Sequence, residues 1–285
     1  MNLSIPKIDA RISDYTETVV RSFFERHQEE KILLVQRTSH LTKYYIFTQY
    51  LIDIGALDEC HNAERTILAN SISDFFGVKA LVEAASLGGA LTLVRNLLER
   101  LINLRYIHKK FPEYADTFYY HAEFEQYLMY ERDRANGEVI IDEPLITRIT
   151  QRYHEIKHLY EKKRSWYQVP LARDLNYQKI NGKTRKVTVG DLARYTELSF
   201  EYERIYSLLS KVSHGQAVTK NMVIADGNFT STPVYDSPHI SVTCGFALEY
   251  FSKTVQSILE RIGRNDFNDY SKWLVHEAMI KEYLK

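Results

Sequence analysis

Four polar side chains on two predicted helices have the residue types and the spacing that acid–base chemistry requires. Arg95 and Glu99 lie one turn apart on the first helix, and Ser210 and His214 lie one turn apart on the second. A histidine exchanges protons near neutral pH, and an arginine stabilises developing negative charge. We therefore take these four residues as the candidate catalytic site, on the condition that the two helices pack side by side.

Each pair also has a structural interpretation. An Arg–Glu pair at i,i+4 on a helix surface contributes about 0.3–0.5 kcal/mol to stability. Gly215 directly follows His214, and a histidine at the C-terminus of a helix is favoured by the helix dipole. Glu203 lies about 16 Å from His214 along a helix, so any group that orients this imidazole must come from another helix. The sequence leaves the catalytic and the structural interpretation open.

The charge balance limits the ways in which this chain binds nucleic acid. The chain has 37 Lys and Arg against 37 Asp and Glu, so its formal net charge is zero. Binding along a phosphate backbone depends on an excess of positive charge. We therefore expect any activity on RNA to depend on a local pocket rather than on the charge of the whole molecule.

Several motifs for cofactors, metals and export are missing from the sequence. The chain has no Gly-x-x-x-x-Gly-Lys-Ser/Thr loop, no Gly-x-Gly-x-x-Gly and no His-Glu-x-x-His. Cys60 and Cys244 are isolated, which gives no zinc-site spacing and suits a reducing compartment. We expect no cofactor and no metal. Because the chain has no secretory pattern and no run of 18 apolar residues, we expect a cytoplasmic protein with no membrane partner.

The elements that must position the candidate site are helices. Only 11 Gly and 6 Pro occur in 285 residues, which favours long helices over folds with many tight turns. Hydrophobic periodicity predicts helices over residues 13–30, 41–54, 58–76, 79–87, 91–110, 112–136, 143–164, 191–213, 238–262 and 266–283. The predicted fold is an all-α multi-helix bundle with a small irregular or β-hairpin insertion.

We expect these helices to pack as one domain in three parts. The first part is an N-terminal helical region over residues 1–79. The second is a helical core over 80–220, with the insertion near 166–190. The third, over 221–285, contains a short hairpin or loop and the C-terminal helices.

Two runs of residues resemble the signatures of a known family. Arg95 to Ile107 (RNLLERLINLRYI) resembles an Arg-x3-Glu helix, and Tyr206 to Gly215 (YSLLSKVSHG) resembles a Tyr-x3-Ser-x3-His helix end. Trp166 and Ala172–Arg173 resemble the segment between them. On these residues the chain is similar, over roughly 80–215, to the domain-of-unknown-function family 5677 of prokaryotes and phages.

The resemblance implies an all-helical protein with a distant likeness to HEPN-type bundles. Such bundles often act as metal-independent ribonucleases in toxin, defence and CRISPR-associated systems, through an Arg-x4–6-His motif. His214 is not part of such a motif here, since nine residues separate it from Arg204.

The functional hypothesis is a HEPN-like, metal-independent ribonuclease or toxin-type effector in prokaryotic or phage defence. RNA cleavage needs a group that exchanges protons, for which we choose His214, and a cation, for which we choose Arg95. Glu99 orients one of them, and Ser210 binds the phosphate. The alternative is a non-enzymatic helical interaction or scaffold protein in which the same four residues form a structural network. The expected partners are RNA, another protein or a second copy of the chain.

Overall fold

The structure is a computed structural model. It describes residues 38–84, 86–137, 143–160, 164–177, 179–180, 183–203, 222–225, 228–231 and 238–283, together with Ala10, Ser13, Asp14, Gln28, Ile32, Leu34 and Val35.

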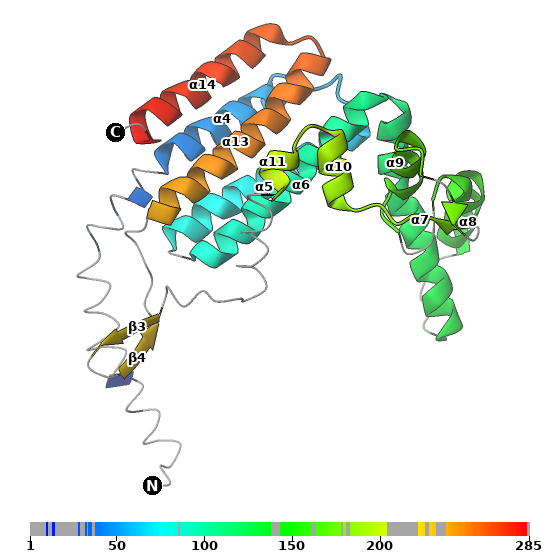
Figure 1. Ribbon diagram of the computed structural model, residues 1–285, viewed down its shortest axis with the longest axis horizontal. Helices are drawn as coiled ribbons and strands as arrows, with labels where there is room; N and C mark the ends of the chain where they lie inside the picture. Colours follow the sequence, from blue (N-terminus) through cyan, green and yellow to red (C-terminus); the bar gives the residue numbers. More distant parts are fainter. Residues whose placement is uncertain are drawn as a thin grey trace.

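Long helices form a bundle that is the largest part of the described chain (Figure 1). They are α4 (Ser39–Asp53), α5 (Asn62–Glu83), α6 (Leu87–Lys109), α13 (Pro238–Arg261) and α14 (Asn265–Tyr283). Short connections join α4 to α5, α5 to α6 and α13 to α14. As a result, α4, α6 and α13 run in one direction, and α5 and α14 run in the opposite direction. α6 lies at the centre and packs most extensively against α5 and α13.

The apolar face of α6 forms the middle of the core, as its periodicity predicts. Val94, Leu97, Leu98, Leu101 and Ile102 are fully buried. Burial of a side chain of this size contributes about 1.5–3 kcal/mol relative to exposure. α6 is therefore a firmly held element, and it carries Arg95 and Glu99.

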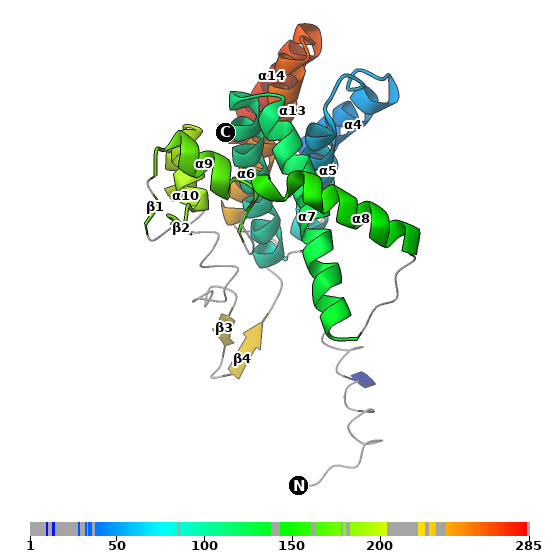
Figure 2. The same cartoon turned by 90° about the vertical axis from the view of Figure 1, so that its right-hand side faces the viewer.

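Further elements lie outside this bundle, and α7, α8 and α9 lie beyond the C-terminal end of α6 (Figure 2). The helices are α7 (Glu113–Ala135), α8 (Glu143–Ile156) with the 3-10 turn η2 (Lys157–Leu159), α9 (Gln168–Asp174), α10 (Val189–Tyr195) and α11 (Ser199–Glu201). Two antiparallel strand pairs are β1 (Lys179–Ile180) with β2 (Lys183–Thr184), and β3 (Met222–Ala225) with β4 (Asn228–Ser231). α8 packs on α7 around a small separate cluster of Phe124, Ile156 and Tyr160.

Gly77 does not end a helix, contrary to the prediction from the sequence. α5 continues through it to Glu83, and the helix predicted over 79–87 is not a separate element. The reason is tertiary packing: a Cβ at Gly77 would lie 2.6 Å from Cδ1 of Leu93 on α6. The missing side chain lets α5 and α6 approach closely, so this glycine serves helix packing rather than chain reversal.

The helix predicted over 191–213 is interrupted within its described part. α10 ends at Tyr195, and Glu197 has a φ of 63°. The amide of Leu198 donates to the carbonyl of Ala193 at 2.8 Å, which closes the end of α10 in the manner of a Schellman motif. The turn lets Leu198 enter the core, where it is buried, and α11 starts in a new direction.

The other predicted helices agree with the structure in part. The helical bundle is confirmed, and α7, α13 and α14 agree with the predicted helices to within a few residues. The helix predicted over 143–164 ends at Ile156, and the insertion near 166–190 contains the helix α9. The helix predicted over 13–30 lies almost entirely outside the described residues. In the described part of the chain, no helix has the length and apolar character needed to cross a membrane.

Candidate functional site

The most buried charged side chain of the bundle belongs to Glu64, in the first turn of α5. His61 is the N-cap residue, and its Nδ1 accepts a hydrogen bond from the amide of Ala63 at 3.1 Å. The carboxylate of Glu64 accepts from the amide of His61 at 2.9 Å. This reciprocal capping box fixes the start of α5 and points the carboxylate into the bundle.

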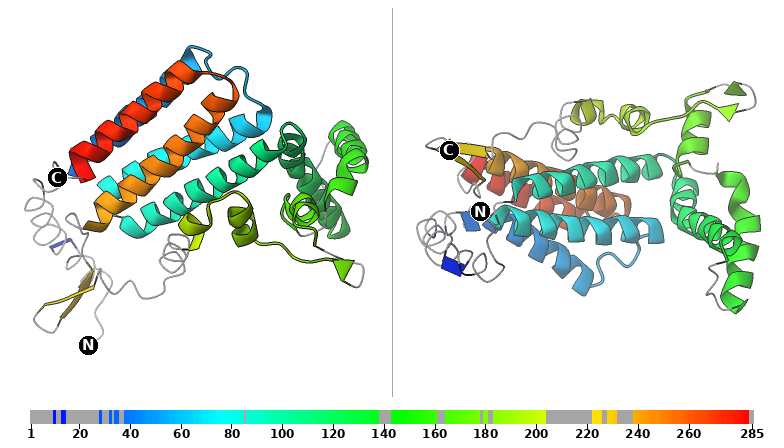
Figure 3. Two further views of the ribbon diagram at one scale, coloured as in Figure 1. Left: turned by 45° about the horizontal axis from the view of Figure 1, so that its top comes forward. Right: turned by 90° about the horizontal axis from the view of Figure 1, so that it is seen from below.

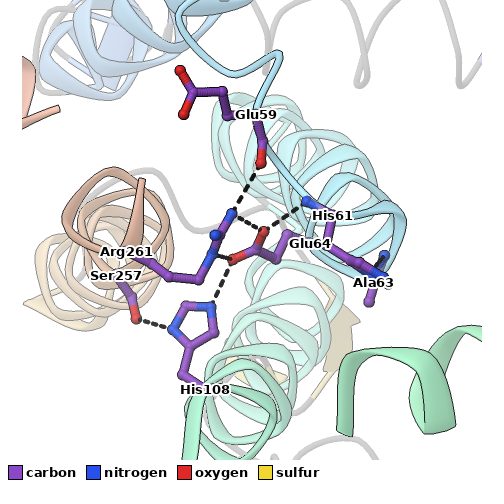
Figure 4. Close-up of polar contacts among 7 residues, drawn as sticks. All are labelled: Glu59, His61, Ala63, Glu64, His108, Ser257 and Arg261. Carbon is purple, nitrogen blue, oxygen red and sulfur yellow. Dashed lines mark hydrogen bonds and ion pairs between the residues drawn. The ribbon is translucent and has the colours of Figure 1, made fainter. Parts of the chain in front are cut away.

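The same carboxylate joins three helices (Figure 4). Nε2 of His108, at the end of α6, lies 2.8 Å from Oε1 of Glu64. The guanidinium of Arg261, at the end of α13, donates to both carboxylate oxygens, with Nη2 at 2.5 Å from Oε2. The side chain of Glu64 is 0% exposed. Burial by itself raises the pKa of this carboxyl, but the hydrogen bonds from His108, Arg261 and the His61 amide outweigh burial and lower the pKa.

Ser257, His108 and Glu64 stand in the order of a serine-hydrolase triad. The hydroxyl of Ser257 lies 3.1 Å from Nδ1 of His108, whose other ring nitrogen meets Glu64. Both imidazole nitrogens are therefore engaged, and the carboxylate is saturated by donors from three helices. Arg261 also lies over the ring of Phe111, with Cζ 4.4 Å from the ring centre. Such a set holds helices in register more readily than it performs chemistry.

A second buried carboxylate lies on the other side of the α6–α7 corner. Asp174, the last residue of α9, accepts from the hydroxyls of Tyr106 at 2.9 Å and Tyr114 at 2.5 Å. Nζ of Lys110 lies 2.8 Å from its other oxygen. Burial alone raises the pKa of Asp174, and these three donors lower it. This network attaches α9 to the corner between α6 and α7.

The residues chosen from the sequence are only partly described. Nε of Arg95 donates to Oε1 of Glu99 at 3.0 Å, so the structure brings the first pair together. These side chains are 24% and 31% exposed. Ser210 and His214 lie outside the described residues.

Sequence reasoning missed the two buried networks. Glu64 stands three residues after a cap, which is a capping-box signal, but histidine is not among the preferred N-cap residues. Nothing local indicates that Arg261, at the far end of the chain, is its partner. Tyr106, Lys110 and Tyr114 follow one another at intervals of four residues at the corner between α6 and α7, which is a local signal. Their acceptor Asp174 is distant in sequence, so the signal does not identify it.

Metal and thiol chemistry find little support in the described residues. Among them, no group of three or more His, Cys, Asp or Glu side chains is placed to hold a metal ion. Both cysteines are buried free thiols, and burial raises the pKa of Cys60 to about 11.

The described chain passes over α6 on its way to the second predicted pair. Glu197 pairs with Lys109 of α6 at 3.5 Å, and Glu201 lies 3.8 Å from Lys253 of α13. Because Ser257 of α13 is level with the end of α6, Lys253 is level with a position one turn earlier on α6. From residue 197 to residue 201, the chain therefore runs antiparallel to α6, toward Arg95.

Comparison with known proteins identifies one family. The profile of a family of unknown function (DUF5677) matches residues 61–229, which is more than half of the chain. The match begins at the N-cap of α5 and includes Glu64, His108 and Asp174, but it ends before Arg261. No curated protein and no solved structure matches the chain.

Proposed function

Because this chain belongs to the DUF5677 family, whose function is unknown, we propose its activity from its own residues: metal-independent cleavage of RNA, as a HEPN-like toxin-type effector in prokaryotic or phage defence. The proposed catalytic residues are Arg95, Glu99, Ser210 and His214. The observation that carries the proposal is the course of the chain from Glu197 to Glu201, which leads toward Arg95.

The register of this course supports the proposed meeting of the two pairs. Arg95 lies fourteen residues before Lys109 on α6, and Glu197 is level with Lys109. A helix that continued antiparallel to α6, as the sequence predicts up to His214, would reach the level of Arg95 about fourteen residues after Glu197. That level falls between Ser210 and His214, so both would lie within about one turn of Arg95.

The proposed chemistry is a transfer within the RNA backbone. His214 removes the proton from a 2′-hydroxyl, whose oxygen attacks the adjacent phosphorus. His214 then returns this proton to the 5′-oxygen as the bond between that oxygen and phosphorus breaks. The products are a 2′,3′-cyclic phosphate and a 5′-hydroxyl. Arg95 stabilises the additional negative charge on the phosphorus oxygens, and Ser210 donates to one of them. Glu99 orients the guanidinium through its carboxylate, which accepts a hydrogen bond from Nε of Arg95 at 3.0 Å.

Cleavage of a labelled single-stranded RNA in the presence of EDTA tests this proposal. We expect the full-length protein to release fragments with cyclic-phosphate ends. His214→Ala should slow cleavage about 100-fold or more, as loss of general acid–base catalysis does. The exposed His276 on α14 provides a matched control, and His276→Ala should cleave at the wild-type rate. Absence of cleavage by the wild type, or an unchanged rate in His214→Ala, would overturn the proposal.

A non-enzymatic interaction or scaffold role is the alternative, and exposed aromatic residues on α4 and α14 favour it. In that case Arg95, Glu99, Ser210 and His214 form a structural network. His214→Ala should then lower the free energy of unfolding by about 1–3 kcal/mol, because its hydrogen-bond partner in the network loses its counterpart. Urea denaturation of the same variant therefore distinguishes the two roles: a stable, inactive protein supports catalysis.

A further inference from the structure

Positive charge is concentrated in one segment of this neutral chain. Residues 162–186, the basic segment, contain eight Lys and Arg and a single Asp, whereas the whole chain contains 37 basic and 37 acidic residues. The rest of the chain is therefore acidic. Such a separation of charge within one protein indicates a partner that carries negative charge.

The described part of the basic segment lies at the edge of the molecule, beyond the helical bundle (Figure 3). It contains α9 and the β1–β2 hairpin, and it ends just before α10, which packs on α6. In the hairpin, Lys179 pairs with Thr184 and Ile180 pairs with Lys183. The hairpin points away from the bundle, where an extended partner can approach it.

A buried glutamine fixes the backbone that follows the hairpin. Nε2 of Gln168 on α9 donates to the carbonyl of Arg185 at 2.8 Å, and Oε1 of the same amide accepts from the amide of Val187 at 3.2 Å. Gln168 is buried, and so is Val187. The side-chain amide thereby takes the place of a neighbouring strand, and it holds Arg185 and Lys186 in a defined position between α9 and α10.

The charges of these two side chains are available to a partner. Arg185 and Lys186 are exposed, and neither forms an ion pair with a residue that the structure describes. The guanidinium of Arg185 lies over the ring of Tyr177, with Cζ 4.6 Å from the ring centre. Arg173 on α9, in contrast, pairs with Glu113 at 2.8 Å.

The side chains around these charges favour a nucleic acid over a membrane. No large apolar side chain is exposed among those that the structure describes from Arg164 to Tyr195, so the surface has nothing to insert into a lipid layer. An arginine beside an aromatic ring, as in Arg185 and Tyr177, is a combination with which proteins hold single-stranded nucleic acid. The positive charge binds phosphates, and the ring stacks on bases.

We propose that the basic segment binds the phosphate backbone of single-stranded RNA, with Arg185 and Lys186 among its contacts. The choice of RNA rests on the proposed function, in which RNA is the substrate. Tyr195 of α10 connects this region to α6, because its ring lies 5.6 Å from that of Tyr106. Arg95 lies about 16 Å from Tyr106 along α6, so a strand bound at the basic segment can continue toward Arg95.

Fluorescence anisotropy with a labelled 2′-O-methyl RNA strand of about 16 nucleotides tests this proposal. The strand has no free 2′-hydroxyl, so binding is measured without cleavage. We expect the full-length wild type to bind it with an affinity that falls as the salt concentration rises. Arg185→Gln/Lys186→Gln should bind about 10-fold more weakly at about 0.15 M salt. In a plot of log K against log salt, its slope should be smaller by about 1.4, since each phosphate contact on a single strand contributes about 0.7.

Two control variants separate the local charge from other effects. Arg185→Lys/Lys186→Arg keeps both charges and should bind within about 2-fold of the wild type, because the salt-dependent attraction depends on charge. Lys43→Gln/Lys272→Gln lowers the net charge by the same amount, but it removes exposed side chains on α4 and α14, which lie far from the hairpin (Figure 1). This variant should bind like the wild type.

Three results would overturn the proposal. The first is a wild type that does not bind the strand, and the second is an unchanged affinity and salt slope in Arg185→Gln/Lys186→Gln. The third is that this variant no longer sediments with phosphatidylserine vesicles, as the wild type does, yet still binds RNA, because the segment would then serve a membrane. Binding of the 2′-O-methyl strand without cleavage of ordinary RNA would support this proposal and overturn only the proposed cleavage.

Discussion

Two polar clusters on α6 differ in how they are built. At its C-terminal end, His108 meets the fully buried Glu64, which Arg261 also binds, so one carboxylate joins α5, α6 and α13. Nearer its middle, Arg95 and Glu99 pair within the helix, and each remains partly exposed. The first cluster joins three helices, whereas the Arg95–Glu99 ion pair lies within one helix.

This difference indicates which of the two clusters can take part in binding a substrate. A buried carboxylate saturated by donors is expensive to disturb and offers no position to a substrate. A partly exposed ion pair within one helix contributes little to stability, so changing it should cost less than changing the buried cluster. Stability and activity should therefore separate when the two clusters are mutated.

Glu64→Ala should have the largest effect on stability. It leaves His108 and Arg261 inside the bundle without their common acceptor, which lowers the free energy of unfolding by about 3–5 kcal/mol. Urea denaturation followed by circular dichroism measures the loss. The exposed Glu260 on α13 provides the control, and Glu260→Ala should stay within about 0.5 kcal/mol of the wild type. A wild-type midpoint for Glu64→Ala would show that the network does not hold the helices.

Asp174→Ala should come second, with a loss of about 2–3 kcal/mol. Tyr106 and Tyr114 lose a buried acceptor, whereas Lys110 is exposed enough to bind water instead. The same denaturation experiment applies, with Asp269→Ala on the surface of α14 as control. An effect equal to that of Glu64→Ala would contradict the ranking of the two networks.

Acid should also lower the free energy of unfolding through the Glu64 cluster. The loss should be smaller than in Glu64→Ala, because the side chain and its partners stay in place. The pKa of Glu64 is lowered from its ordinary value of 4.5. Its contribution to stability is therefore complete above that value and is lost as the pH falls through the lower pKa of the folded state. Urea midpoints at several pH values below 5 should fall more steeply for the wild type than for Glu64→Gln, which has no carboxyl to protonate. Parallel curves would argue against an ionised Glu64.

Arg95→Ala should have the smallest effect on stability, at most about 1 kcal/mol. If the proposed RNA cleavage is correct, the same change should slow it about 100-fold or more. Both quantities are measured on one protein preparation. A large loss of stability would place Arg95 with the buried cluster and remove the contrast between the two regions.

Sequence reasoning succeeded for features that depend on residues close in sequence, and it failed for features that depend on contacts between distant residues. The buried face of α6 was predictable because periodicity depends on neighbouring turns, and so was the Arg95–Glu99 pair. Gly77 was misread, because its role depends on Leu93 across the helix interface rather than on its neighbours in sequence. The turn at Glu197 escaped prediction for the same reason, since it serves to bury Leu198.

The sequence by itself determined the helical character of the chain and the pairing of residues one turn apart, because both depend on atoms close along the chain. Only the tertiary structure decided that Glu64 meets His108, 44 residues away, and Arg261, 197 residues away. It also decided that α4 and α14 lie side by side, with the rings of Phe47 and Tyr270 5.2 Å apart. Such contacts depend on how helices are placed in three dimensions, and no spacing within one helix contains that information.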